Sequence, residues 1–450
     1  MRAPTRVAIC GGGVAAMEAL MALRQLLPIH PHVDLIAPNR EFIYRPLAVA
    51  EPFGLARTRL FDLAEVAQEF RAELHVGSLA RVDGESRHVV LASGTRLPYD
   101  AALIAVGARR SAWLDGALSF GDAQDVQAFA ALLERLEEGE ISRLAFVCPQ
   151  PLMWTLPLYE LALLTAARLA ERGVVGVELT LVTPETAPLA VFGATASEML
   201  RRQLCDRGIR LHAGASAESL SSGHLELSTG ETLEVEETVA LARLTGPGIE
   251  GLPADADGFI PIDEHCRVVG LEDVCAAGDG TAFPIKQGGI ATQQADVAAE
   301  FIAARLGAVS QPQTFEPHLR GMLLTGLAPM YLRASASGTS TERGEVAANP
   351  LWMPPTKIAG LHLGPYIART STLGGPRPLE DRRASTRDPE ELLTANREAC
   401  ELALTLAEAD AHSGDYHSAL DWLQAVERIE GVLPPGYLAK RDAWKARANQ

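Results

Sequence analysis

Short buried-strand patterns alternate with helical patterns along the first part of the chain. Arg6–Cys10 (RVAIC) predicts a buried strand, and three consecutive glycines follow it. Val14–Leu27, rich in Ala, Leu and Met, predicts a helix, and Val33–Ala37 predicts a second strand. A strand, a glycine turn, a helix and a strand within about 35 residues form a βαβ unit whose helix N-terminus can hold a pyrophosphate.

The same layout returns in the middle of the chain. A charged helix near Asp125–Glu138 precedes an apolar strand, Leu144–Cys148, and a proline-rich turn. A helix over Leu158–Arg172 and a strand over Val177–Val182 follow. The sequence therefore predicts an α/β fold with two Rossmann-like units.

Later segments depart from this repeat. A hairpin-like stretch, Leu225–Ala242, leads to a Gly/Pro break. Val274–Ala277 then predicts a short strand, and a long helix is expected from about Gly289 to Leu306. Near the C-terminus, Asp388-Pro389-Glu390-Glu391 is a helix start, and Gly414–Val426 resembles one tetratricopeptide unit. One such unit cannot bury its own apolar face, so it should pack on the core, a second subunit or a partner protein.

Composition and charge narrow the function. The chain has 450 residues, with 40 Lys and Arg against 57 Asp and Glu, a formal net charge of -17. Such an acidic surface repels polyphosphate, so no nucleic-acid partner is expected. Six widely spaced cysteines exclude a disulfide scaffold and favour a reducing compartment.

No signal peptide or transmembrane segment is predicted. The first residues run directly into the strand and glycine turn, with no cleavable apolar segment. The most apolar stretch, Phe146–Ala170, contains three prolines and Glu160, which would be poorly satisfied in lipid. We therefore expect a cytoplasmic protein, at most peripheral to a membrane.

The first glycine turn, Gly11-x-Gly13-x-x-Ala16, suits a dinucleotide. Gly11 permits the tight turn, Gly13 lets the backbone approach a phosphate, and Ala16 lets the helix pack closely on the strand. A ribose-binding carboxylate normally ends the second strand, but Ala37 stands there, so Asn39 or backbone amides are expected to hold the adenosine.

A second motif follows the strand at residue 274. Its segment VCAAGD delivers Asp279 at a glycine turn, where a carboxylate can accept hydrogen bonds from a ribityl chain. A helix that starts just beyond can point its positive end at a flavin.

Together, the segments ICGGGVAAMEAL, YDAALIAVGAR and DVCAAGDGTAFPIKQGGIATQQA resemble the two-dinucleotide-binding-domain flavoproteins, the pyridine nucleotide–disulfide oxidoreductase superfamily. Type II NADH dehydrogenases and sulfide:quinone oxidoreductases are the most similar members. The resemblance covers roughly residues 6–370 and implies FAD, an oxidoreductase and often a dimer.

The resemblance also implies positions for the cofactor. Gly11, Gly13 and Ala16 would hold the FAD pyrophosphate, and Asp279 would bind the ribityl chain. The other residues expected to bind FAD flank these motifs: Val14, Ala15, Asn39, Arg45, Ala105, Gly107, Gly278, Gln287, Gly288, Gly289 and Ile290.

The implied organisation has five parts. Residues 1–112 and 251–330 would form the FAD-binding domain, and 113–250 a second Rossmann-like domain with a degenerate NAD(P) site. Residues 331–387 would form an interface segment and linker, and 388–450 a tetratricopeptide-like helical hairpin.

The second unit departs from relatives that take a hydride from NAD(P)H. Its turn reads CPQPLMWTLPLYE over residues 148–160, without a glycine. Prolines lack the amide proton that a phosphate needs, so the usual binding mode for nicotinamide dinucleotides is not expected. The Pro-x-Tyr-Glu helix opening resembles that of sulfide:quinone oxidoreductases.

Catalytic residues are less well defined. Trp154 stands where those enzymes carry one of their redox cysteines, so sulfide oxidation by the family mechanism is not expected. Cys148 is the cysteine nearest this region. Lys286 and Lys357 lie in flavin-proximal motifs, where a positive charge stabilises a reduced flavin. These three residues are the catalytic candidates, and no metal site is predicted.

Three functions stay open. The first is an FAD-dependent oxidoreductase whose electron donor or acceptor is not NAD(P)H, with a quinone as a candidate. The apolar segment Pro350–Ala368 would then contribute to a quinone pocket, or else to an interface. The second is an NAD(P)H dehydrogenase with an atypical nucleotide site. The third is a flavin-stabilised interaction protein that acts through its C-terminal helices.

Overall fold

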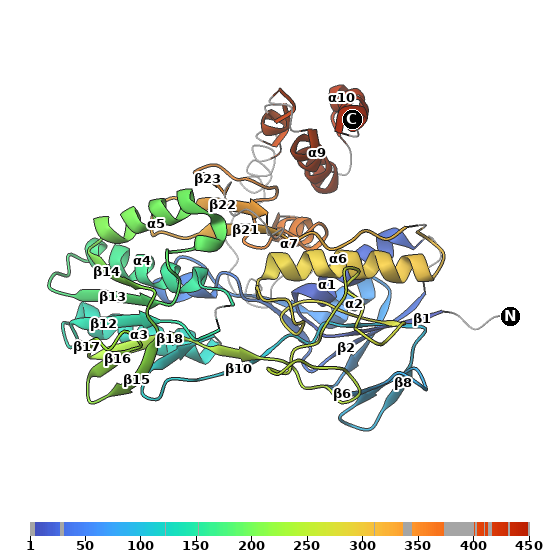
Figure 1. The fold of residues 1–450 in the computed structure, drawn as a ribbon. Coiled ribbons are helices and arrows are strands. Elements are labelled where there is room, and N and C mark those ends of the chain that lie inside the picture. The colour runs from blue at the N-terminus through green and yellow to red at the C-terminus, as the bar shows by residue number, and fades with distance from the viewer. Residues whose placement is uncertain are drawn as a thin grey trace.

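The computed structural model in Figure 1 describes most of the 450 residues. The described ranges are 5–27, 31–121, 123–151, 153–309, 311–335, 344–372, 400, 403–408, 410–412, 416–430 and 433–448. The expected helix start at residues 388–391 lies outside them.

The first unit is built on a parallel five-stranded sheet of order β20-β9-β1-β2-β5. Its strands are β1 (Arg6–Cys10), β2 (His32–Ala37), β5 (Ala72–Val76), β9 (Ala101–Ile104) and β20 (Val274–Ala276). Helices α1 (Val14–Leu26) and α6 (Gly288–Arg305) pack on each other and cover one face. The antiparallel sheet of β6 (Leu79–Asp83), β7 (His88–Leu91) and β8 (Arg96–Pro98) covers the other.

Short elements complete the first unit. They are β3 (Glu41–Tyr44) and β4 (Arg59–Asp62), which pair antiparallel, the 3-10 helix η1 (Ala48–Phe53) and helix α2 (Leu63–Glu69). The strands β10 (Arg109–Ser111) and β19 (Arg243–Thr245) pair antiparallel and run between the two units.

The second unit repeats the architecture with the parallel order β11-β18-β12-β13-β14. Its strands are β11 (Leu118–Phe120), β12 (Arg143–Val147), β13 (Glu178–Thr183), β14 (Ile209–Ala213) and β18 (Glu237–Leu241). Its helices are α3 (Ala123–Glu137), α4 (Leu156–Glu171), η2 (Ala190–Phe192) and α5 (Ala194–Asp206). An antiparallel sheet of β15 (Ala217–Ser221), β16 (His224–Leu227) and β17 (Thr232–Glu234) packs on the other face.

Both parallel sheets confirm the predicted α/β fold with two Rossmann-like units. The stretch 225–242 differs from the expected hairpin in one respect. The strands β16 and β17 form a hairpin, but β18 instead inserts between β11 and β12 in the parallel sheet. The segment TVAL at 238–241 is buried, which suits a central strand rather than a hairpin arm.

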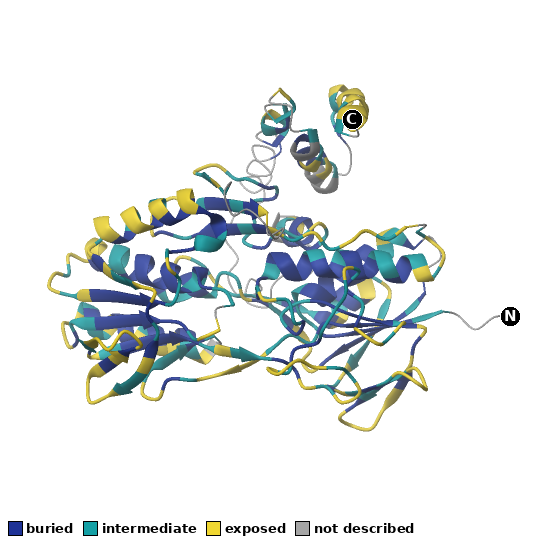
Figure 2. Ribbon diagram, in the orientation of Figure 1, coloured by how far each residue is buried: buried dark blue, intermediate teal, exposed yellow. Residues whose placement is uncertain are grey.

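The C-terminal part contains a small antiparallel sheet and helices. The elements are β21 (His318–Leu323), β22 (Met330–Ser335), β23 (Glu345–Ala347), α7 (Leu363–Thr372), α9 (Tyr416–Glu430) and α10 (Pro435–Ala448). Helix α10 was not predicted from the sequence, because its residues are largely exposed (Figure 2) and carry little apolar periodicity. Ala403, Trp422 and Leu423 belong to a separate apolar cluster among these last helices.

The turn between β1 and α1 is fixed by one close backbone approach. Gly11 has φ +142°, and a Cβ atom there would lie 2.1 Å from the carbonyl oxygen of Ala105. The Gly11 amide donates to the carbonyl of Ile36 at 2.7 Å, and the Ala105 amide donates to that of Cys10 at 2.7 Å. The turn is therefore joined to the ends of β2 and β9.

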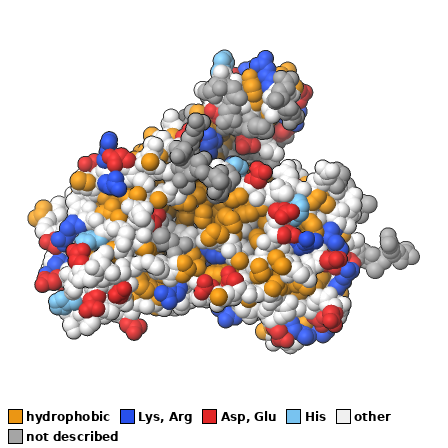
Figure 3. Space-filling model, viewed as in Figure 1, with side chains coloured by type: hydrophobic (Ala, Val, Ile, Leu, Met, Phe, Trp, Pro, Cys, Tyr) orange, Lys and Arg blue, Asp and Glu red, His pale blue; other side chains and the backbone are white. Residues whose placement is uncertain are grey.

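The surface carries apolar side chains in the middle of the face seen in Figure 3, between the two units, and many of its charges toward the two ends. None of the helices in the described ranges is both long and apolar enough to cross a membrane.

We predict that Gly11→Ala lowers the free energy of unfolding by more than about 3 kcal/mol, because it adds a clash to a strained backbone. Gly94→Ala is the matched control: Gly94 also has positive φ (+87°), but nothing lies within 4 Å of the position that its added methyl group would take. The control should cost about 1 kcal/mol. Urea unfolding followed by circular dichroism measures both, and equal losses would contradict this account of the turn.

Candidate functional site

A cavity of about 670 Å³ lies at the carboxyl ends of the strands of the first sheet. Its lining includes the residues that directly follow β1, β2, β5, β9 and β20, and it extends to the second unit at Trp154 and Glu160. The carboxyl ends of parallel strands are where ligands bind in such sheets. Its volume lies in the range of cofactor sites.

Most of the predicted site residues meet at this cavity. Those that line it are Gly11, Gly13, Val14, Ala15, Asn39, Arg45, Ala105, Gly107, Gly278, Asp279, Lys286, Gln287, Gly288 and Lys357. Four do not line it: Ala16, Cys148, Gly289 and Ile290. Ala16 is fully buried in the core between α1 and its neighbours, as expected for a packing position.

The N-terminus of α1 opens onto the cavity. Gly13 is its N-cap, and no atom lies within 4 Å of a Cβ built there. No side chain among the described residues caps this helix end, so its first amides stay available to a bound group. A helix N-terminus of this kind attracts an anionic group such as a pyrophosphate.

The other end of the cavity carries buried charge. Burial raises the pKa of Asp279, an effect that Arg110 and Lys286 oppose. Burial lowers the pKa of Lys286 to about 8, and Asp279 opposes this shift. The Lys286 ammonium donates to the carbonyl of Thr281 and lies 3.7 Å from the ring centre of Phe259.

At the same end of the cavity, the side-chain oxygen of Gln287 is an unsatisfied hydrogen-bond acceptor. Its Nε2 donates to the carbonyl of Arg320 at 2.5 Å, whereas its buried Oε1 has no hydrogen-bond partner among the described residues. Buried polar atoms are nearly always satisfied, so a donor on a bound group would complete this site. Helix α6 also begins here, at Gly288, against the side chain of Ile358.

A buried ion pair joins the second unit to the C-terminal part beside the cavity. Lys357 Nζ lies 2.7 Å and 2.6 Å from the two carboxylate oxygens of Glu160, whose side chain is fully buried. Burial raises the pKa of Glu160 and lowers that of Lys357, and each charge opposes the shift of the other. In the sequence, Glu160 stood out only as part of a helix opening. Its pairing with a residue 197 positions away has no local signal.

Near the end of β2, the cavity is lined by a carboxylate that was not predicted from the sequence. Glu41, at the start of β3, lines the cavity close to Asn39. The position normally expected for a ribose-binding carboxylate is the end of β2, four residues earlier. Asp34, within β2, does not line the cavity, whereas Asn39 does.

In the second unit, the carboxylate that follows β13 is already hydrogen-bonded within the protein. Glu185 stands two residues after β13, near where a ribose-binding carboxylate follows the second strand of such a unit. Tyr159, in the first turn of α4, donates its hydroxyl to Glu185 Oε2 at 2.5 Å, and Thr183 Oγ1 donates to the same oxygen at 3.3 Å. Glu185 was not among the predicted site residues, although its distance along the chain from the turn was a usable signal.

Cys148 lies away from the cavity, directly after β12. Its thiol is buried and lies 3.8 Å from Thr183 Oγ1, to which it donates. Burial raises the pKa of Cys148 to about 12. A thiol of this kind is almost entirely protonated at neutral pH and is a poor nucleophile.

A second cavity, of about 690 Å³, lies between the core and α9. Asp421 and Trp422 of α9 form part of its wall, and Arg320 lines both cavities. Helix α9 also contacts α7. Of the packing arrangements expected for the C-terminal helices, the structure therefore shows contact with the core.

Comparisons with known proteins agree with this architecture. The profile of the family described as pyridine nucleotide-disulphide oxidoreductase matches residues 161–299. Two NADH dehydrogenase-like proteins of Mycobacterium tuberculosis are 25% identical over 299 residues and 26% identical over 296 residues. Each alignment covers 62% of this chain and 73% of the relative.

Solved structures share the fold at lower identity. The sulfide:quinone oxidoreductase of Aquifex aeolicus superposes with a TM-score of 0.70 and 18% identity, over 76% of this chain and 86% of that one. The ferredoxin reductase of the CYP199A2 system from Rhodopseudomonas palustris gives 0.56 and 21%, over 74% and 83%. The family match, the relatives and the fold together confirm the resemblance drawn from the sequence.

FAD is the cofactor of this superfamily, and the residues present fit it. The open space at Gly13 and the free helix end suit a pyrophosphate, and the unsatisfied Gln287 oxygen suits a ring donor. The chain is similar to the pyridine nucleotide-disulphide oxidoreductases over residues 161–299, and its fold and cavity are those of an FAD-dependent oxidoreductase.

Proposed function

We propose that this oxidoreductase exchanges electrons with a small donor and acceptor other than NAD(P)H, and that a quinone is one of them. The observation that carries the proposal is the second unit, whose nucleotide turn has prolines instead of glycines and whose Glu185 is engaged by Tyr159. A dinucleotide would need amide donors at this turn and a carboxylate for its ribose. The prolines remove amide donors from this turn, and the Glu185 carboxylate already accepts a hydrogen bond from Tyr159.

The proposed FAD site follows the first cavity. Gly11, Gly13 and Ala15 would hold the pyrophosphate, Asn39 and Glu41 would lie at the adenosine, and Asp279 at the ribityl chain. Bound FAD supplies two-electron redox chemistry. Lys286 Nζ would place a positive charge near the reduced cofactor and stabilise it.

The acceptor would enter between the two units. Trp154, Met322 and Ile358 give this part of the wall an apolar character that suits a quinone ring, and Lys357 offers a donor to a polar oxygen. Quinone reduction takes up two protons as well as two electrons. Burial moves the pKa values of Glu160 and Lys357 toward their neutral forms, so this pair can deliver a proton from Lys357 Nζ to the acceptor.

The proposal also includes the domain organisation, the cellular location and the oligomeric state. The five-part division of the chain, the location in the cytoplasm or at a membrane surface, and the dimer all stay predictions. A second function, NAD(P)H dehydrogenase with an atypical nucleotide site, is favoured by the similarity to NADH dehydrogenase-like proteins.

An anaerobic stopped-flow screen separates these two functions. We expect a water-soluble quinol to reduce the bound flavin at least about a hundredfold faster than NADH or NADPH, because the second unit lacks the contacts that bind their phosphates. Flavin absorbance near its long-wavelength band is the readout, and dithionite gives the fully reduced reference. Rapid bleaching by NADH would establish the second function instead.

The alkaline side of the pH profile tests the ion pair. The Glu160 carboxylate raises the pKa of Lys357, so its removal lowers that pKa. We predict that Glu160→Gln moves the loss of quinone-reducing turnover at high pH to a lower pH and reduces the maximal rate by about tenfold or more. Steady-state turnover across pH measures this shift.

Glu138→Gln, at the exposed turn residue that follows α3, is the matched control for this measurement and should leave the profile unchanged. The double variant Glu160→Gln/Lys357→Met removes both buried charges and checks that the fold tolerates the change. An identical alkaline limb in the wild type and Glu160→Gln would contradict a proton-delivering pair.

Cys148 is predicted to be dispensable. Cys148→Ala should leave turnover with the preferred donor within about threefold, because the thiol is buried and protonated. Thiol labelling followed by mass spectrometry provides an independent measure: Cys205, the exposed cysteine, should react at pH 8, and Cys148 should not. Labelling of Cys148 together with loss of turnover would restore a cysteine-based mechanism.

A further inference from the structure

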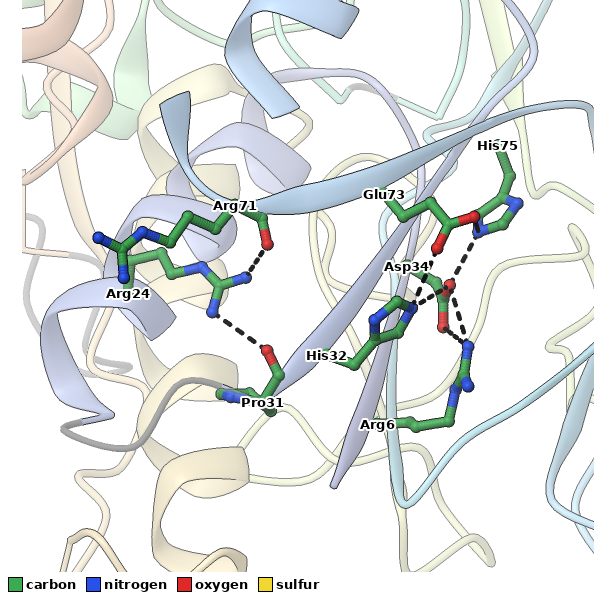
Figure 4. A network of polar contacts seen from close by, with 8 residues as sticks. All are labelled: Arg6, Arg24, Pro31, His32, Asp34, Arg71, Glu73 and His75. Atoms are coloured by element: carbon green, nitrogen blue, oxygen red, sulfur yellow. Dashed lines mark hydrogen bonds and ion pairs between the residues drawn. The ribbon is translucent and has the colours of Figure 1, made fainter. Parts of the chain in front are cut away.

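A cluster of ionisable side chains lies on the first sheet outside the cavity (Figure 4). Its centre is Asp34, whose side chain is fully buried. Asp34 Oδ1 lies 3.0 Å from Nε2 of His32 and 2.8 Å from Nε2 of His75. Glu73 Oε2 lies 3.4 Å from the same His32 nitrogen. None of these residues lines the cofactor cavity.

The strand register explains why these side chains meet. In the parallel pair β2–β5, Asp34 stands opposite Glu73. Residues two apart along a strand face the same side of the sheet, so His32 joins Asp34 and His75 joins Glu73. The sequences HVDLIA and AELHV therefore place two imidazoles and two carboxylates on one face.

The geometry of three of these groups suits a metal ion. One ligand atom each from His32, Asp34 and Glu73 lies within 4.8 Å of the others. Tetrahedral Zn²⁺, with bonds of about 2.0–2.2 Å, needs ligand atoms about 3.3–3.6 Å apart. The distances from His32 to Asp34 and to Glu73, 3.0 Å and 3.4 Å, are close to this requirement.

The remaining two groups can hold the buried carboxylate in place. His75 donates to Asp34 Oδ1, and Arg6 Nη2 lies 3.3 Å from Asp34 Oδ2. Such outer contacts commonly orient metal ligands. The His32 side chain is 32% exposed and that of Glu73 59%, which leaves an entry route and room for a water ligand.

The net charge of this cluster also favours a bound cation. Asp34 and Glu73 carry two negative charges, and Arg6 compensates one of them. With neutral imidazoles, the cluster keeps one net negative charge at a partly buried position, which favours a divalent cation.

We propose that His32, Asp34 and Glu73 form a binding site for a divalent transition-metal ion of the Zn²⁺ class, with His75 and Arg6 as positioning residues. The ion would join β2 to β5, the strands whose carboxyl ends lead to Asn39 and Ser78 at the cofactor cavity. This proposal is independent of the electron donor and acceptor.

Isothermal titration of the FAD-loaded protein with ZnCl₂, in a buffer that does not chelate metals, tests the site. A Cys205→Ser background removes the exposed thiol as a competing ligand. We expect one saturable site, at least about tenfold weaker in His32→Gln and in Glu73→Gln, and weakened within the range of about tenfold to a hundredfold in His75→Gln. Cu²⁺ electron paramagnetic resonance should show nitrogen coupling that His32→Gln removes.

His224→Gln, an exposed histidine of the second unit whose ring pairs with the Ser222 carbonyl, is the matched control and should bind like the parent. Glu73 is largely exposed, so Glu73→Gln should fold even if the changes nearer Asp34 do not. Absence of saturable binding, or unchanged binding in both His32→Gln and Glu73→Gln, would overturn the proposal and leave a hydrogen-bonded network that stabilises Asp34.

Discussion

The structure depends first on a backbone contact that only glycine permits. At Gly11 the chain turns with positive φ and passes so close to the Ala105 carbonyl that any side chain would collide with it. This contact sets the ends of β1, β2 and β9 beside one another and aims the N-terminus of α1 at the space between them. The location of the cofactor cavity, and of the charged groups at its far end, follows from that arrangement.

The second unit has the same sheet architecture with a different turn. Prolines remove amide donors from this turn, and the hydroxyl of Tyr159 donates a hydrogen bond to the carboxylate of Glu185. The helix that begins there nevertheless contributes to the site, because its Glu160 pairs with Lys357 next to the cavity. The second unit can thus supply a wall and a buried ion pair for the proposed acceptor site.

The fold was largely predictable from local patterns. The strand–glycine–helix order and the repeated βαβ layout identified both sheets, and the motifs around Gly13 and Asp279 identified residues that line one cavity. The Glu160–Lys357 pair was not predictable, because it joins distant segments and depends on tertiary packing. Helix α10 was missed because it is exposed and only weakly amphipathic. The insertion of β18 into the parallel sheet was missed because its pairing with β11 and β12 depends on tertiary packing.

The central claim is that one nucleotide site holds FAD and the other holds no dinucleotide. A crystal structure of the protein purified with its cofactor, from crystals soaked in NADH, tests this claim most directly. We predict density for FAD along the first cavity, with its pyrophosphate at the amides after Gly13, and none for a dinucleotide beside Tyr159 and Glu185. An NADH molecule at the carboxyl ends of β12 and β13, with its ribose hydrogen-bonded to Glu185, would contradict the account.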